Sequence, residues 1–309
     1  MKRALNPDKR TAQAYVPGHI TCLFRIHDSH PDVLHRGSQG AGFSVEMGTL
    51  TTITVSEQAK PRLKIAYNGR KLQAKVTKTV VEKLTEDYGL TLDVNINHQS
   101  DLPIGVGFGA SGAGALGTAL ALGHLIDQNM DYNSAAQYAH EAEVINHTGL
   151  GDVIAQTLGG LEIRLAPGAP GIGKAINVTY PEDISVVLSG ATSLETKSVL
   201  TNPAARELVN KAGDRLIKSI MEHPSLESIV SSSIDFADAI GLESPRIRSA
   251  LSDLKSSGYN MSSMVMLGDS VYCLCDENEV PNVVSILRTY WNESEVFVTK
   301  ISNQGGVLC

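Results

Sequence analysis

Hydrophobic and polar positions along the chain follow two spacings, which predict strands and helices. Alternating or β-branched residues predict strands over 12–26, 43–56, 90–97, 161–165, 184–188, 262–267, 270–275 and 295–301. Apolar residues three and four apart predict helices over 71–87, 111–126, 134–147, 152–158, 203–222, 226–240, 245–256 and 280–291. A polar, glycine-containing loop is expected over 28–42, and Asn133 is the expected N-cap of the helix over 134–147. Because these elements follow no regular βαβ period, the pattern favours an α+β fold over a doubly wound sheet.

The length of the chain, 309 residues, is enough for about two domains at roughly 150 residues each. A connector rich in proline and glycine covers 166–173, and a new strand begins at 184. We therefore expect an N-terminal domain over 1–178 and a C-terminal α+β domain over 179–309.

Residues 104–126 contain no Lys, Arg, Asp or Glu and are long enough to cross a bilayer. Seven of them are glycines, which weaken a helix interior. Asp101 and Asp127 flank the stretch, without basic anchors at either end. The pattern favours a glycine-rich loop that runs into a buried helix, and a membrane span is the less favoured alternative.

The composition limits the kinds of partner. With 26 Lys and Arg against 33 Asp and Glu, the net charge is −7, which argues against a surface for nucleic acid but permits a small anionic ligand. The four cysteines are too few for a disulfide scaffold of this size, so free cytosolic thiols are expected.

The glycine-rich loop predicts a phosphate-binding site. Glycines let the backbone approach phosphate oxygens, and the free amides at the start of the following helix attract an anion. The candidate nucleotide-binding residues are Pro103, Gly105, Gly107, Phe108, Gly109, Ala110, Ser111, Gly112 and Ala113. Ser111 could also place its hydroxyl on a phosphate-bound metal. The alternative is a glycine-rich helix that packs tightly against a sheet.

A second glycine pattern, GxxxxGK over 168–174, resembles the start of a P-loop. Ala175 supplies no hydroxyl for Mg²⁺, and a β-like stretch follows where a P-loop requires a helix. This pattern is therefore rejected as a nucleotide site.

The next predicted helix carries His140, Glu143 and His147 on one face. A zinc site is disfavoured because the two histidines are seven residues apart and no HExxH pattern is present. Asp152 follows a glycine break at the start of another helix, where it could meet a ligand or serve as an N-cap. Glu143 could likewise be an ordinary solvated residue.

Three stretches resemble motifs of the GHMP kinase superfamily: residues 14–21 (AYVPGHIT), residues 103–113 (PIGVGFGASGA), and Glu143 followed by Gly151-Asp152 and Gly159-Gly160. Within the superfamily, His19 and residues 37–42, 107–115, 162–164 and 190–193 are most similar to the archaeal pantoate kinases. The resemblance implies a two-domain fold, with a ribosomal-protein-S5-like ATP-binding domain followed by a ferredoxin-like domain. It also implies a cytoplasmic kinase that uses ATP and Mg²⁺ to phosphorylate the 4-hydroxyl of pantoate on the archaeal route to coenzyme A.

The resemblance also implies roles for single residues. Ser111 and Glu143 match the ligands of Mg²⁺, and Asp152 matches the catalytic base or hydroxyl-orienting group. Arg164 matches the arginine that holds the substrate carboxylate. The positions that match the lining of the acid pocket are Ser38, His140 and Ala191.

Two positions and one segment depart from the superfamily pattern. Ala110 replaces the first serine of the loop, and His19 replaces the lysine of the first motif and is a second candidate catalytic residue. Residues 264–268 replace the third, glycine-rich motif. Two alternatives therefore stay open, namely the same chemistry on another alcohol such as homoserine or mevalonate, and a non-catalytic sensor of a nucleotide or metabolite. We expect pantoate and ATP as ligands and no nucleic-acid or membrane partner, and a homodimer stays open.

Overall fold

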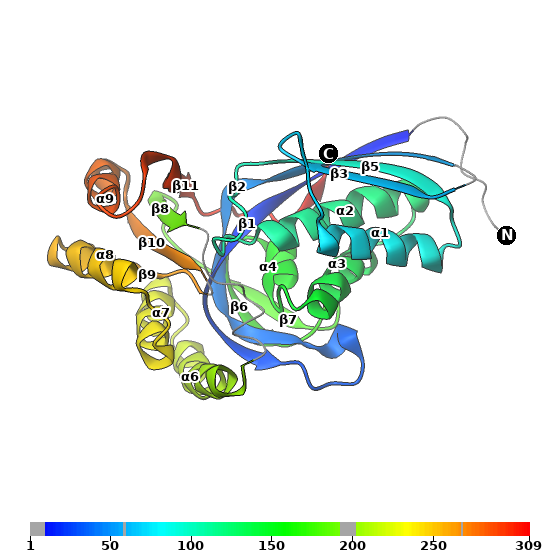
Figure 1. Cartoon of the computed structure of the whole chain (residues 1–309). Helices are drawn as coiled ribbons and strands as arrows, with labels where there is room; N and C mark the ends of the chain where they lie inside the picture. Colours follow the sequence, from blue (N-terminus) through cyan, green and yellow to red (C-terminus); the bar gives the residue numbers. More distant parts are fainter. Residues whose placement is uncertain (1–9, 58–59, 192–201, 267) are drawn as a thin grey trace.

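The computed structural model describes residues 10–57, 60–191, 202–266 and 268–309. It contains two β-sheets, each with helices packed beside it (Figure 1). The mixture of largely antiparallel strands and helices confirms the expected α+β class.

The first sheet has eight strands in the described part of the chain. They are β1 (Arg10–His27), β2 (Gly37–Glu57), β3 (Arg62–Tyr67), β4 (Arg70–Lys71), β5 (Leu92–Ser100), β6 (Leu161–Ala166), β7 (Lys174–Val178) and β12 (Val307–Leu308). Their order is β12-β1-β2-β5-β3-β4. Strand β6 pairs with residues 40–43, near the start of β2, and with β7. Only the pair β3 and β5 is parallel among these neighbours.

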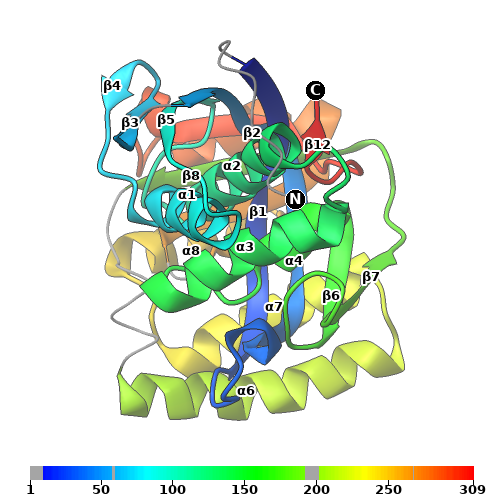
Figure 2. The same ribbon diagram turned by 90° about the vertical axis from the view of Figure 1, so that its right-hand side faces the viewer.

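Four helices cover one face of this sheet: α1 (Lys75–Asp87), α2 (Ala110–Ile126), α3 (Tyr132–Asn146) and α4 (Asp152–Leu158). Figure 2 shows them in front of the strands. Helix α2 lies between β1 and β2 on one side and α1 and α3 on the other, so nearly its whole surface is buried. This burial explains the uninterrupted apolar sequence that resembles a membrane span. Within the described residues, no helix has both the length and the hydrophobicity that crossing a bilayer requires.

The second sheet has the order β11-β8-β10-β9, formed by β8 (Ile184–Ala191), β9 (Ser262–Met264), β10 (Asp269–Asp276) and β11 (Val296–Lys300). Its helices are α6 (Pro203–Glu222), α7 (Leu226–Ile240), α8 (Pro245–Ser256) and α9 (Val280–Leu287). The side chains of Asn202, Ser225 and Ser244 accept hydrogen bonds from the first free amides of α6, α7 and α8. These caps fix the starts of the three helices at the predicted positions.

Strands β1 and β2 are long enough to contact the helices of both sheets, and so they connect the first sheet with the second sheet and its helices. Bulges at Pro17/Gly18 and Thr21/Leu23 shift the register of β1 against β2. Beyond these bulges β1 packs against α6 and α7, and the Ser233 hydroxyl on α7 donates to the Cys22 carbonyl. His19 lies between the two bulges, where its amide donates to Phe108 of the glycine-rich loop over 103–109, the predicted phosphate loop.

The structure differs from the sequence-based expectations at several elements. Residues 37–42 belong to β2 instead of the expected loop, and β3, β4 and β12 were not predicted. Helix α3 begins after Asp131, whose carboxylate accepts from the Ser134 amide, so the expectation of Asn133 as N-cap was wrong. Leu267, the expected end of a strand, and residues 192–193 of the pantoate kinase resemblance lie outside the described residues. The domain boundary at 178/179 stays a prediction.

Candidate active site

A cavity of about 720 Å³ lies where the glycine-rich loop, the starts of α2 and α4 and the end of α3 meet β6. Most of the predicted site residues line it: Ser38, Pro103, Gly105, Gly107, Phe108, Gly109, Ala110, Ser111, Gly112, Glu143, Asp152 and Arg164. The other predicted residues, His19, Ala113, His140 and Ala191, are not among the residues that line it. Groups that are far apart in the sequence therefore share one cavity.

The phosphate loop takes a backbone shape that requires glycine. Gly105, Gly107 and Gly109 have φ values of +81°, +86° and +74°, in the left-handed region that side chains disfavour. A Cβ atom on Gly109 would lie 2.8 Å from the His19 backbone nitrogen, which donates to the Phe108 carbonyl. The loop is thus tied to β1 and leads into α2, whose first amides attract an anion.

Ser111 and Glu143 form a polar pair at the start of α2. The Ser111 hydroxyl donates to Glu143 Oε1 at 2.5 Å, and Glu143 Oε2 is buried without a hydrogen-bond partner. Burial raises the pKa of Glu143 to about 7, although the bond from Ser111 opposes the rise and the charge of Asp152 adds to it. A buried carboxylate oxygen without a donor, beside a hydroxyl, suits a hard cation such as Mg²⁺.

Asp152 begins α4 and presents its carboxylate to the same cavity. Its Oδ1 lies 2.8 Å from Nδ1 of His19, and its side chain is 24% exposed. Burial raises the pKa of Asp152, but the hydrogen bond from His19 and the charges of His19 and Arg164 outweigh it and hold the pKa below 3.8. Asp152 is therefore ionised near neutral pH and can accept a hydrogen bond from a hydroxyl.

His19 is completely buried between two carboxylates. Its Nδ1 contacts Asp152, and its Nε2 lies 3.2 Å from Oε1 of Glu162. Burial lowers the pKa of His19, but the charges and hydrogen bonds of Glu162 and Asp152 outweigh it, so the pKa lies above 6.5. When protonated, His19 would place a positive charge behind Asp152, at the position where the superfamily pattern has lysine.

Arg164 contributes a buried guanidinium to the cavity wall. Its Nη1 donates to Oε1 of Glu162, whereas its Nε is buried without a partner. Glu162 and Arg164 are two residues apart in β6, so both side chains lie on the same face of the sheet. No role for Glu162 was predicted from the sequence, although two charged residues at alternate positions of an otherwise apolar strand indicate a buried ion pair.

The other residues predicted to line the acid pocket are Ser38, His140 and Ala191, and only the first of them lines the cavity. Ser38 lines the cavity next to Gly151. His140 is buried in α3, and its Nε2 lies 2.9 Å from the Arg36 carbonyl. Among the described residues, no group of three or more His, Cys, Asp or Glu side chains could hold a metal. Ala191 ends β8, opposite Asp269 of β10. The roles of all three in binding the acid stay predictions.

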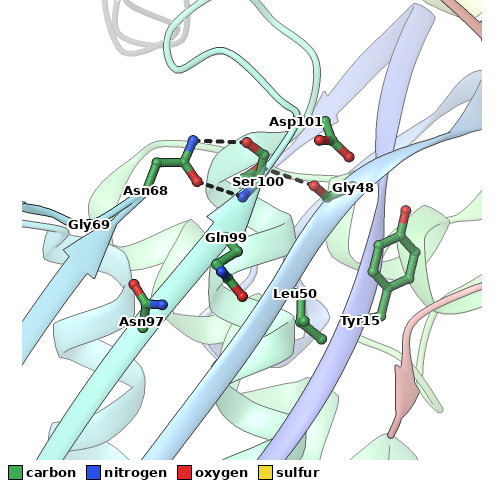
Figure 3. A pocket seen from close by; sticks show the side chains of 9 residues that line it. All are labelled: Tyr15, Gly48, Leu50, Asn68, Gly69, Asn97, Gln99, Ser100 and Asp101. Atoms are coloured by element: carbon green, nitrogen blue, oxygen red, sulfur yellow. Dashed lines mark hydrogen bonds between the residues drawn. The ribbon is translucent and has the colours of Figure 1, made fainter.

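A second hollow lies on the opposite face of the first sheet (Figure 3). Its lining consists of Tyr15, Gly48, Leu50, Asn68, Gly69, Asn97, Gln99, Ser100 and Asp101. Asn68 Nδ2 donates to the Ser100 carbonyl at 2.9 Å, and the Ser100 amide donates to Asn68 Oδ1 at 2.8 Å, so these bonds join the turn between β3 and β4 to the end of β5. No residue predicted as a site from the sequence lines this hollow.

Comparison with known proteins agrees with the motifs and with the cavity. Residues 75–160 match the family described as GHMP kinases N terminal domain. The pantoate kinase of Thermococcus kodakarensis is 34% identical over 279 residues, which cover 89% of this chain and 91% of that protein. The chain belongs to the pantoate kinase family. A second curated pantoate kinase, from Methanocaldococcus jannaschii, is 33% identical and covers 89% of this chain and 96% of its own length.

A solved structure agrees with membership in the pantoate kinase family. It is described as a phosphotransferase related to the CoA biosynthesis pathway, and it shares 30% identity and a TM-score of 0.87 over 97% of this chain and 99% of its own. The GHMP kinase fold and the kinase class expected from the sequence are thereby confirmed.

Proposed function

We infer that this protein is an ATP-dependent kinase that phosphorylates pantoate. The kinase class comes from the family, and the related enzymes are named for pantoate as their substrate. The observation that carries the proposal is that one cavity contains the phosphate loop, the Ser111–Glu143 pair, the carboxylate of Asp152 and the guanidinium of Arg164. Together these groups provide a site for the phosphates, ligands for a metal, an acceptor for the hydroxyl proton and a partner for the carboxylate.

The ATP phosphates lie, in this proposal, against the loop around Gly107 and Gly109 and the first amides of α2. Ser111 and Glu143 hold Mg²⁺, whose charge neutralises that of the phosphates. The unpartnered Oε2 of Glu143 supports this assignment, because it leaves an anionic oxygen available for a cation.

The acceptor binds through both of its polar ends. Its carboxylate pairs with Arg164, whose unpartnered Nε suits a carboxylate. Asp152 accepts or orients the proton of the 4-hydroxyl, whose oxygen forms a bond to the γ-phosphorus as the bond to the β-phosphate oxygen breaks and ADP leaves. The transition state of phosphoryl transfer is loose, so the protein contributes mainly positioning and charge. His19 contributes its positive charge next to Asp152.

A cytoplasmic location is part of the same proposal. The enzyme needs ATP, and the four cysteines are free thiols, as expected in a reducing compartment.

A coupled assay of ADP release tests the proposed function. Purified protein with MgATP is incubated separately with pantoate, mevalonate, homoserine and galactose. Of the four alcohols, we expect only pantoate to be turned over. Phosphorus NMR of the product should show the new phosphate ester on the 4-hydroxyl. Turnover with another alcohol and none with pantoate would assign a different substrate. ATP binding without turnover of any of the four would favour a sensor.

A further inference from the structure

Two buried groups behind the cavity wall connect the two side chains that would hold opposite ends of the acceptor. Asp152 and Arg164 line the cavity, whereas His19 and Glu162 lie behind them and do not. His19 Nδ1 is 2.8 Å from Asp152 Oδ1, and Nε2 is 3.2 Å from Glu162 Oε1, the same oxygen that accepts from Arg164 Nη1. The result is a continuous chain of contacts from Asp152 to Arg164.

The first sheet is shaped to accommodate this chain. Gly42 and Gly40 of β2 pair with Glu162 and Arg164 of β6, respectively. A Cβ atom on Gly42 would lie 2.7 Å from His19 Nε2 and 3.2 Å from Glu162 Oε1, and one on Gly40 would lie 2.8 Å from Arg164 Nη2. Glycine at both positions therefore leaves the space that the charged groups occupy.

Glu162 determines which part of the Arg164 guanidinium is available. It takes Nη1, whereas Nε stays unpartnered and faces Gly151, where a Cβ atom would lie 2.8 Å from Nε and 2.3 Å from the Ser38 hydroxyl. Gly151 and Ser38 both line the cavity. A guanidinium binds a carboxylate best in a fixed fork geometry, so a partner that fixes its plane prepares it for a ligand.

We propose that Glu162 is a positioning residue that fixes the Arg164 guanidinium and the His19 imidazole together, and so sets the distance between the acceptor's carboxylate and hydroxyl sites. The inference rests on the proposed function. Glu162 is 1% exposed and makes no contact with the cavity, so it acts through its two neighbours. A purely structural ion pair would stabilise the fold without affecting how the acid binds.

The substitution Glu162→Gln keeps the shape of the side chain and removes its charge. We expect kcat/KM for pantoate to fall by about 10- to 100-fold, because a misplacement near 1 Å can reduce rates by about 100-fold. KM for ATP should stay unchanged, because the phosphate loop does not contact Glu162. The matched control is Glu141→Gln, which makes the same exchange in a partly exposed pair with Lys83 outside the cavity. The control should leave both KM values unchanged.

Calorimetric titration of pantoate in the absence of ATP separates positioning from folding. If Glu162 acts on the acid through Arg164, the Kd for pantoate should rise in Glu162→Gln and in Arg164→Ala. It should rise no further in the double variant than in Arg164→Ala. Independent, additive increases would overturn the proposed connection.

Two further results would overturn the inference while the proposed function stands. One is a folded Glu162→Gln variant with wild-type kcat and KM for pantoate. The other is a loss of activity that matches the loss of folded protein in a thermal melt, with both KM values unchanged. If Glu162→Gln does not fold, Glu162→Asp keeps the charge but retracts it by one methylene, and it should raise KM for pantoate alone. A wild-type enzyme that does not turn over pantoate would instead overturn the proposed function, and this inference with it.

Discussion

Replacing Glu143 with glutamine should stabilise the metal-free protein at pH 8 and have a much smaller effect at pH 5. The reason is that Glu143 is buried in the cavity wall, with one carboxylate oxygen unpartnered and with Asp152 as a charged neighbour. The folded protein therefore holds the proton of Glu143 more tightly than the unfolded chain does. Ionisation of Glu143 then lowers the stability of the fold.

The magnitude follows from the pKa of Glu143, which burial raises from 4.5 to about 7. Each pH unit between these values corresponds to about 1.4 kcal/mol, so full ionisation destabilises the fold by roughly 3 kcal/mol. The stability is fully present below pH 4.5 and is lost as the pH rises through 7. A glutamine cannot ionise, so the variant escapes this loss, and its amide has the same burial cost at both pH values.

Equilibrium unfolding in urea at pH 5 and pH 8, with EDTA present, measures this effect. The stability of Glu143→Gln minus that of the wild type should increase by about 2–3 kcal/mol from pH 5 to pH 8. The same Glu→Gln exchange at the partly exposed Glu141, which pairs with Lys83 outside the cavity, is the matched control. If the difference for Glu143→Gln does not change between the two pH values, Glu143 is ionised in the fold without penalty, and the reasoning from its burial is refuted.

Three further substitutions test single parts of the site. Asp152→Asn should lower kcat by about 100- to 10,000-fold, the usual contribution of a general base, while ATP still binds by calorimetry; near-normal turnover would remove Asp152 from this role. Arg164→Lys keeps the charge but loses the fork geometry, so KM for pantoate should rise by roughly tenfold with KM for ATP unchanged, and an unchanged KM for pantoate would place the carboxylate elsewhere. Gly109→Ala forces a side chain into the left-handed region and against the His19 amide. It should lower the free energy of unfolding by at least about 1–2 kcal/mol and weaken ATP binding. A wild-type free energy of unfolding together with wild-type ATP affinity would contradict the loop geometry.

The sequence predicts elements well where a local signal fixes them. Helices α6, α7 and α8 begin and end at the predicted residues because an amphipathic period follows a capping Asn or Ser. Strand β3 was missed although Arg62 and Lys64 alternate with apolar residues, because the strand is only six residues long and its last residues, Ala66 and Tyr67, do not continue the alternation. The glycines that begin β2 resemble a loop in the sequence, yet they are in a strand because charged side chains from β1 and β6 need their space.

The candidate site shows the same division. The glycine-rich loop could be predicted because glycine spacing is a local feature, whereas the pairing of Ser111 with Glu143, 32 residues apart, was implied only by the resemblance to the GHMP kinases. The contacts of His19 with Asp152 and Glu162 could not be predicted, because only the pairing of β1, β2 and β6 brings these residues together. Long-range pairings of this kind leave no periodic signal in the sequence.

The last described segment, residues 302–309, has a consequence for how the enzyme is made. It returns to the first sheet, where the Gly160 amide donates to the Ser302 carbonyl, the Gly306 amide to the Gln156 carbonyl and the Cys309 amide to the Gln13 carbonyl. These bonds fasten the end of α4 and the approach to β6, the two elements that carry Asp152 and Glu162. During translation the segment is synthesised after every other described residue. We therefore expect the end of α4 and the approach to β6 to reach their final positions only after this segment has been synthesised and has docked.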